Sequence, residues 1–380
     1  MDSMSTMMRK KPTIRDVAQL AGVSYGTVSR YLNGGEHVSP DAAERIAQAI
    51  SKAQYTPNNA ARTLARQRTH AVALIIQVES NETIVQASVS AAMTGANQVL
   101  GDAGYQMVTL IANTESSTER ILRLVGSDFA DGYLLFSMSN DDQFAESFRN
   151  VGAPVVRSEI GGDLPYPAVD FTNEQGQYDI TRYLLDKGRR RLLYICGPGY
   201  SPTALNRYEG FKRAMGDQFR EGDVYFADSW EIDNGEMAVA EFESRFVRPG
   251  AAAARVAAGA DSADAVAADS GAAGAGVDAA VAGVADGIDG VVCANDDIAM
   301  GAIRRLTHMG YRVPEDVSVT GFDDSPIALL SDPKLTTVRQ DSQLHGETMA
   351  RLLLDIMDGK PLGERHTVLL PTTIMHRRSA

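Results

Sequence analysis

From Ala71 onward, short apolar runs alternate with longer stretches whose apolar residues recur at helical spacing. Continuous apolar strands that alternate with amphipathic helices are typical of a parallel, doubly wound sheet. The strands are too many for one sheet, so the sequence predicts two lobes with a ligand crevice at the strands' carboxyl ends. The strand-like runs are AVALIIQV, YQMVTLI, GYLLFS, APVV, RLLYIC, DVYFA, GVVCAN and VSVTGF, and the helical stretches are 84–101, 174–187, 203–215 and 298–309.

The N-terminal part of the chain shows helical periodicity only. Apolar residues recur at helical spacing over 14–21, and Ser24 follows as a cap for a second helix. Small Ala18 permits close approach, Gly22 supplies a sharp turn and Val28 fills the angle between the helices. This triplet indicates a helix-turn-helix. The alternative is a plain helical pair with a solvated polar face.

A third helix, 40–53, is predicted after Ser39, and a basic segment, 55–69, follows it. The motifs VSYGTVSRYLN, HVSPDAAERIAQAI and YTPNNAARTLA closely resemble the DNA-binding headpiece and hinge of the lac repressor family. The resemblance covers the first 70 residues almost without gaps. It implies double-stranded DNA as a partner, contacted by Thr13, Ser24, Tyr25, Gly26, Thr27, Ser29, Arg30, Asn33, Tyr55, Asn58, Ala61 and Leu64.

The outward face of the second helix carries the side chains best suited to reading a major groove. Arg30 can hold a guanine edge with two hydrogen bonds, whereas Gly26 leaves one base-reading position without a side chain. The resemblance further implies that the hinge folds only on the operator and wedges Leu64 between base pairs. The alternative is that Leu64 packs on the body of the protein.

Charge is distributed unevenly along the chain. Residues 1–70 hold ten Lys and Arg against five Asp and Glu, whereas the remaining residues hold 26 against 44. An acidic body repels nucleic acid, so DNA contact is expected through the basic N-terminal part.

Cysteine usage and the N-terminus predict a cytoplasmic protein. Cys196 and Cys293 end apolar runs, which favours buried thiols over a disulfide framework. The N-terminal segment lacks the apolar core of a signal peptide, and no apolar run approaches the ~20 residues of a membrane helix. The six histidines show no ligand spacing, so neither a metal site nor a cofactor is expected beyond a small-molecule effector.

The resemblance implies a three-helix headpiece with a hinge helix, followed by a two-lobed core like that of periplasmic binding proteins, an α + α/β fold class. Crossovers between the lobes are expected near Phe171, 340–341 and 368–370. The segment 249–287 is nearly all Ala, Gly, Asp and Val, and is interpreted as a surface insertion, flexible or loosely helical. The expected divisions are 1–56 for the headpiece, 57–70 for the hinge, 71–170 with 342–367 for the first lobe, and 171–340 with 368–380 for the second.

Polar and aromatic residues fall at or just after the predicted strand ends of the core. A neutral polyol is bound by Arg and carboxylate groups that pair with hydroxyls, with an aromatic ring against the apolar face of the sugar. Asp296 and Asp324 lie beside these residues, and capping a helix or tying loops is the favoured role for Asp324. By motif position, the residues matching the family's effector contacts are Phe171, Arg207, Trp230, Asn295 and Asp323.

Three departures from the family pattern bear on ligand identity. The loop QVESNETIVQ lacks the proline and paired aromatics common there and holds Glu79 instead, which favours a ligand rich in hydrogen-bond donors. Ser342 and His345 stand where relatives often have apolar groups. No named sugar or operator is therefore transferred. For Phe171 and Trp230, the alternative to contact with the effector is packing in the hydrophobic core.

Together these features predict a ligand-controlled transcription regulator, a repressor of carbohydrate-utilisation genes that a sugar-type effector releases from a pseudo-palindromic operator. The absence of a heptad tail favours a homodimer. The main alternative is a regulator that binds DNA more tightly with a co-repressor, either a purine or a partner protein. An enzyme using Asp323 and Asp324 as an acid–base pair is disfavoured, because adjacent strand residues point to opposite faces. A transport protein is also disfavoured, because it would need an export signal.

Overall fold

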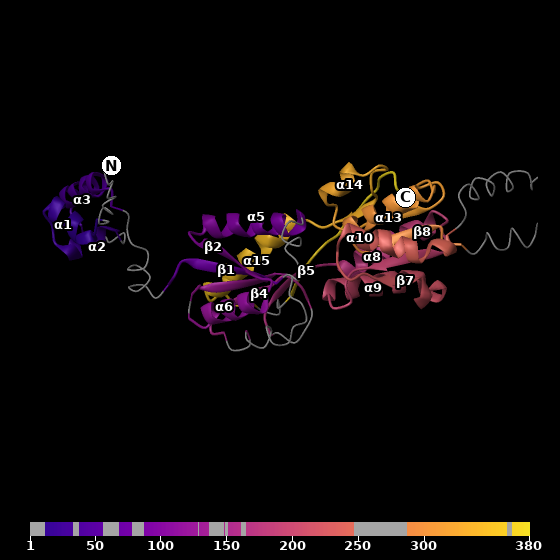
Figure 1. Cartoon of the computed structure of the whole chain (residues 1–380). Coiled ribbons are helices and arrows are strands. Elements are labelled where there is room, and N and C mark those ends of the chain that lie inside the picture. The colour runs from indigo at the N-terminus through magenta and orange to yellow at the C-terminus, as the bar shows by residue number, and fades with distance from the viewer. Residues whose placement is uncertain are drawn as a thin grey trace, which may run out of the picture. The chain divides into compact units, whose positions relative to one another are not determined.

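The computed structural model describes residues 12–32, 38–55, 68–77, 87–127, 129–136, 148, 151–160, 165–246, 287–362 and 367–380. The chain forms two compact units, Met1–Thr69 and His70–Ala380 (Figure 1). We refer to them as the headpiece and the body. Among the described residues, no helix has the length and apolar character required to span a bilayer.

The described part of the headpiece contains three helices, α1 (Ile14–Ala21), α2 (Tyr25–Leu32) and α3 (Pro40–Ala53). Gly22 ends α1 with φ 64°, a left-handed conformation that glycine adopts without strain. Val28 is fully buried against Ala18 in the core shared by all three helices. The predicted helix-turn-helix is therefore confirmed. The guanidinium of Arg45 donates to the carbonyl of Ala21 at 3.1 Å, which ties α3 to the end of α1.

The first lobe of the body is built on a six-stranded sheet in the order β11-β5-β4-β3-β1-β2, with parallel neighbours throughout. Helices α5 and α15 pack on one face and α6 on the other (Figure 1). The elements are β1 (Ala71–Gln77), α5 (Ala87–Asp102), β2 (Gln106–Ala112), α6 (Glu115–Val125), β3 (Gly132–Phe136), β4 (Val155–Arg157), β5 (Ala168–Phe171), α15 (Ser342–Met357) and β11 (Thr367–Leu370).

The second lobe has a four-stranded parallel sheet in the order β7-β6-β8-β9. Helices α8 and α9 cover one face, and α10, α13 and α14 cover the other. The elements are α8 (Asn173–Asp186), β6 (Leu192–Cys196), α9 (Pro202–Met215), β7 (Val224–Phe226), α10 (Ile232–Glu241), β8 (Gly290–Cys293), α13 (Asp296–His308), β9 (Ser318–Thr320) and α14 (Pro326–Leu330), with three 3-10 turns, Gly216–Gln218, Glu221–Asp223 and Glu243–Arg245.

Two further strands, β10 (Thr337–Arg339) and β12 (Thr373–Met375), pair antiparallel and pack beside α8. Strand β11 pairs with β5 through Leu370, so the chain passes to the second lobe only after that residue. Our placement of Phe171 and of 368–370 in the second lobe is therefore wrong, since Phe171 ends β5 and pairs with Leu370 in the first sheet. The apolar run TVLL prolongs the first sheet, and Pro371 begins the passage between the lobes.

Cys196 and Cys293 are free, buried thiols at the ends of β6 and β8. Burial raises the pKa of Cys196 to about 12, so its thiol stays protonated. The proposed insertion, 249–287, lies outside the described residues except for its last position. Its flanks, Phe246 and Ile288, form a parallel bridge, so the chain leaves and re-enters the second lobe at one place.

Candidate DNA-binding face and effector cleft

Helix α2 presents an outward face of polar and aromatic groups. Ser24 caps the helix by accepting the backbone N–H of Thr27 at 3.1 Å, as the sequence predicts. Tyr25, Gly26 and Arg30 are exposed, and Arg30 also donates to the carbonyl of Gly26 at 3.2 Å along its own helix. These groups, together with half-buried Thr27 and Ser29, are available to base edges and phosphates in a groove.

Two other predicted DNA contacts have structural roles in the headpiece. Thr13 forms a capping box with Asp16, in which its hydroxyl and backbone N–H bond to the carboxylate at 2.8 and 2.7 Å. Tyr55 packs against the headpiece core. Their contacts to DNA remain predictions. Asn33, Asn58, Ala61 and Leu64 lie outside the described residues, so the predicted hinge helix and the Leu64 wedge are untested.

We expect Arg30→Ala to weaken binding to the preferred operator by about 1–3 kcal/mol and to relax base preference at one position. The exposed guanidinium is the group on α2 that can bond two acceptors of one base. Competition binding across single-base operator variants measures the effect. The control Lys52→Ala removes an exposed cation from α3 and is expected to leave base preference intact. Equal loss for Arg30→Ala on every sequence would assign that residue to phosphate contact only.

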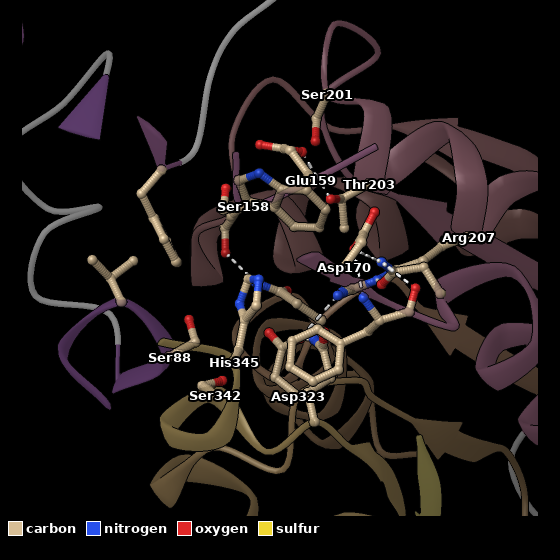
Figure 2. Close-up of a pocket in the computed structure, with 17 residues that line it drawn as sticks. Ser88, Ser158, Glu159, Asp170, Ser201, Thr203, Arg207, Asp323, Ser342 and His345 are labelled. Atoms are coloured by element: carbon tan, nitrogen blue, oxygen red, sulfur yellow. Dashed lines mark hydrogen bonds and ion pairs between the residues drawn. The ribbon is translucent and has the colours of Figure 1, made fainter. Parts of the chain in front are cut away.

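The body contains a cleft between the two lobes that holds about 760 Å³ of space, part of it open solvent. Its lining comes from the carboxyl ends of strands in both sheets and from the helices that follow them (Figure 2). Five of the six predicted effector residues line it, namely Phe171, Arg207, Trp230, Asn295 and Asp323. The sixth, Glu79, lies outside the described residues.

Arg207 on α9 is the central cation of the cleft and is only 3% exposed. Its Nε donates to Asn173 at 3.0 Å and one terminal nitrogen donates to the carbonyl of Ala294. The other terminal nitrogen pairs with Asp323 at 3.2 Å, and the guanidinium stacks 3.8 Å from the centre of the Phe322 ring. The fixed, planar guanidinium thereby holds the carboxylate of Asp323 beside the cleft.

Asp323 and Asp324 have different partners. Asp323 accepts from Arg207 and Gln340 at the cleft, whereas Asp324 is ion-paired to Arg339 and Arg377 away from it. Burial raises the pKa of Asp323, and the two cleft donors oppose that rise. Asp324 therefore ties loops together, as the sequence predicts, and the two carboxylates do not form a pair around one bond.

Asn295 and Trp230 form the second-lobe wall of the cleft. The Asn295 side chain caps α13 by accepting the backbone N–H of Ile298 at 2.9 Å, and its amide donates to the carbonyl of Trp230 at 2.9 Å. Gly197 leaves room for the Trp230 ring, since a side chain there would overlap it. Asp296, fully buried, accepts from Ser325 and Thr337 and so has a structural role.

Phe171 stands at the first crossover with its ring edge-on to His345, 5.0 Å between ring centres. The Nε2 atom of His345 contacts the carbonyl of Val169 at 2.8 Å. Burial lowers the pKa of His345, which favours the neutral ring at neutral pH. The two rings form the first-lobe floor of the cleft, so Phe171 serves both the core and the cleft.

Our sequence reasoning missed several lining residues, chief among them Asp170, Glu159 and Thr203. Asp170 is 3% exposed and accepts from the backbone of Ile160 and Phe171 and from Asn173 at 2.7–3.0 Å. Burial raises the pKa of Asp170, and these donors counteract the rise. An acid at the end of a buried strand was the available signal. For Glu159, on a loop, the sequence offered none.

A hydrogen bond between Thr203 and Glu159 also joins the two lobes at the cleft. The hydroxyl of Thr203, at the start of α9, donates to the carboxylate of Glu159, just after β4, at 3.0 Å (Figure 2). The remaining polar lining groups are Ser88, Ser158, Ser201, Gln340 and Ser342. A cleft of hydroxyl, amide and carboxylate groups with aromatic walls suits a hydroxyl-rich ligand. Among the described residues, no cluster of His, Cys, Asp or Glu could hold a metal ion.

Asp297 follows Asp296 in the first turn of α13, and the pKa of its carboxyl group is higher than is usual for aspartate. Burial, aided by the charges of Asp323 and Glu231, raises its pKa to about 6. The folded protein therefore binds the proton more tightly than the unfolded chain, so ionisation costs stability above pH 6 and the cost disappears toward pH 4.

Asp297→Asn is accordingly expected to stabilise the body at pH 7.5 by roughly 1 kcal/mol, a value discounted because solvent reaches the carboxylate. Melting temperatures from pH 4 to 8 check this, and the gain should shrink below pH 6. Exposed Asp102→Asn, at the end of α5, is the control and should show no such trend. A gain of equal size at every pH would contradict the assignment.

Comparison with known proteins agrees with this architecture. Residues 13–58 match "Bacterial regulatory proteins, lacI family", and residues 181–380 match a "Periplasmic binding protein-like domain". The HTH-type transcriptional regulator CelR of Thermobifida fusca is 31% identical over 379 residues, covering 98% of this chain and 99% of CelR. The ribose operon repressor of Halalkalibacterium halodurans is 28% identical and covers 97% and 96%.

Two solved structures share the fold along nearly the whole chain. A CelR–cellobiose complex has a TM-score of 0.67 with 29% identity and covers 97% of this chain and 100% of the other. The lac repressor dimer bound to operator and the anti-inducer ONPF has a TM-score of 0.77 with 22% identity and covers 97% and 99%. The chain therefore belongs to the lacI family of bacterial regulatory proteins, whose matched members are transcription regulators rather than enzymes.

Proposed function

We propose that this protein is a sequence-specific DNA-binding repressor of carbohydrate-utilisation genes, released from its operator by a sugar-type effector. The observation that carries the proposal is the combination, in one chain, of an exposed reading helix and a cleft built around the Arg207–Asp323 pair. Relatives named as a regulator in complex with cellobiose and as a ribose operon repressor support the sugar class. Bacterial DNA lies in the cytoplasm, so the protein acts there.

The cleft geometry supports a closure mechanism. The residues that line the cleft are divided between the lobes, with Asp170 and His345 in the first and Arg207 and Asn295 in the second. A ligand that touches both walls favours one relative placement of the lobes over another. Through the crossovers that change would reach β1, where the chain enters the body from the headpiece, and lower operator affinity, typically by ~1–3 kcal/mol for such couplings.

A homodimer on a pseudo-palindromic operator follows from the same proposal. Two copies related by a two-fold axis match two half-sites related by the same symmetry. The lac repressor dimer of like fold supports this arrangement. Mass measurement of the protein–operator complex is expected to give two chains per site.

Operator selection followed by gel shifts tests the function as a whole. The full-length protein should enrich one pseudo-palindromic sequence from random duplexes, and a sugar from a broad panel should release it. Enrichment of no sequence would refute the regulator. A ligand that instead tightens DNA binding would replace the inducer mechanism with a co-repressor mechanism.

A further inference from the structure

Negatively charged side chains outnumber positively charged ones among the described residues that line the cleft. Three carboxylates, those of Glu159, Asp170 and Asp323, face one guanidinium, that of Arg207, among the described lining residues. His345 adds no charge at neutral pH, because its buried ring donates to and packs against uncharged groups. A ligand entering the cleft therefore meets a mainly negative surface.

The guanidinium of Arg207 already has hydrogen-bond and ion-pair partners within the protein. Each of its three nitrogens donates to a protein oxygen, namely those of Asn173, Ala294 and Asp323, and its face is covered by the Phe322 ring. Three of its five N–H groups are engaged in this way, so an anionic ligand would compete with Asp323 for the positive charge of this guanidinium. Displacement would leave that carboxylate half-buried without its counter-charge, which is unfavourable.

Helix N-termini are the other groups that could attract an anion. Of the helices that start at the cleft, α9, α13 and α15 are capped by side chains. Ser201 accepts from Ala204 at 3.4 Å, Asn295 from Ile298 at 2.9 Å, and Asp341 from Leu344 at 2.9 Å. The cap oxygens already bond backbone donors in these first turns, and Asp341 brings a further negative charge to α15. The first turn of α8 has no side-chain cap, but the carboxylate of Asp170 lies beside it and accepts from Asn173.

Glu159 is partly exposed, as is Asp323, whereas Asp170 is buried. Glu159 stands on the first lobe and accepts from Thr203 of the second, so any ligand that bridges the lobes passes beside it (Figure 2). Arg157 interacts electrostatically with Glu159 and Asp170, but it does not line the cleft, and its Nε donates to the carbonyl of Tyr166. Carboxylate oxygens at this place accept hydrogen bonds from hydroxyl or ammonium groups and repel carboxylates and phosphates.

We propose that the cleft binds polyols that are uncharged or carry an amine and excludes sugar acids and sugar phosphates, with Glu159 as the residue that sets this selectivity. The inference rests on the proposed function and narrows its ligand class. It makes the effector a carbohydrate before phosphorylation or oxidation, whose hydroxyls act as hydrogen-bond donors to the first lobe.

The test is calorimetric titration of the full-length protein with matched sugar sets on the glucose, galactose, ribose and cellobiose skeletons. Each set holds the neutral sugar, its acid and its phosphate, and an amino sugar is added where one exists. For the skeleton that binds, we expect the acid and the phosphate to bind on the order of 100-fold more weakly than the neutral sugar, since like charges would meet in the cleft. A loss of less than tenfold would overturn the charge rule while leaving the sugar effector in place.

Titrations in which no sugar of any set binds, with no release from the operator, would overturn the proposed function and the charge rule together. Glu159→Gln separates charge from shape, because its amide oxygen can still accept from Thr203. In this variant, the ratio of the affinity for the neutral sugar to the affinity for the acid is expected to fall by about tenfold. The control Glu174→Gln removes an exposed carboxylate paired with Arg213 on the outside of the second lobe and should leave the ratio unchanged. An unchanged ratio in Glu159→Gln would remove Glu159 from the proposal.

Discussion

Arg207→Lys is expected to keep operator binding and to lose release by sugar, with sugar affinity lowered at least ~100-fold. Lysine retains the positive charge but has one ammonium in place of the fork that reaches Asn173, Ala294 and Asp323 together. Without the fork, the carboxylate of Asp323 and the amide of Asn173 lose their fixed orientation. Operator gel shifts with increasing sugar, together with calorimetry, measure both results.

Arg213→Lys is the matched control for this variant. It makes the same substitution on the same helix, but Arg213 is about half exposed and pairs with Glu174 at the surface. Exposed ion pairs of this kind contribute ~0–1 kcal/mol, so sugar release should match the wild-type protein. An Arg207→Lys protein that is released at the wild-type sugar concentration would remove Arg207 from the effector site.

The free energy of unfolding of the Arg207→Lys protein should also fall, by about 1–3 kcal/mol. Buried acceptors, the carbonyl of Ala294 among them, would lose a donor in a region closed to water. Trp230 is the only tryptophan in the chain and packs partly on the cores of the second lobe, so its fluorescence follows unfolding of the body.

The headpiece could be predicted from the sequence because its signals are local. Apolar spacing, the Ser24 and Ser39 caps and the turn at Gly22 lie within one or two helical turns of the elements that they define. The predicted bounds of α1 and α3 agree with the structure. The capping role of Thr13 was missed, although the threonine and Asp16 stand at capping-box spacing.

The cleft could be predicted only where a strand end or a family motif marked a residue. Arg207, Asn295 and Asp323 come shortly after strong strands, which gave both signals. Glu159 and Thr203 meet through the placement of two lobes, and no local pattern reports a contact between residues 44 positions apart. Asp170 lies in β5, a short strand that is absent from our predicted strands, although β5 supplies residues that line the cleft.

The pairing of β11 with β5 shows the same limit at the level of topology. These strands lie almost two hundred residues apart, and their register depends on which sheet has an open edge. Hydrophobic pattern alone identifies TVLL as a strand but does not assign it to a sheet. The last crossover was therefore placed slightly too early.

Close helix contacts through glycine are another feature that periodicity does not reveal. On facing helices, Gly235 of α10 lies against the backbone of Ile298, and Gly301 of α13 lies against the backbone of Ile232. A Cβ at either position would overlap a main-chain oxygen rather than the end of a movable side chain. The two helices are thus held at a spacing that only glycine permits at these points.

We therefore expect Gly301→Ala to destabilise the body by about 3 kcal/mol, since α10 and α13 must separate along their length to admit the methyl group. Urea unfolding followed by Trp230 fluorescence measures the change. Gly101→Ala is the control, because Gly101 lies in α5 with no atom near the new methyl. There alanine should raise stability by about 0.5–1 kcal/mol through helix propensity. Should Gly301→Ala unfold at the wild-type urea concentration, the helices can separate at little cost, and glycine at position 301 does not set their spacing.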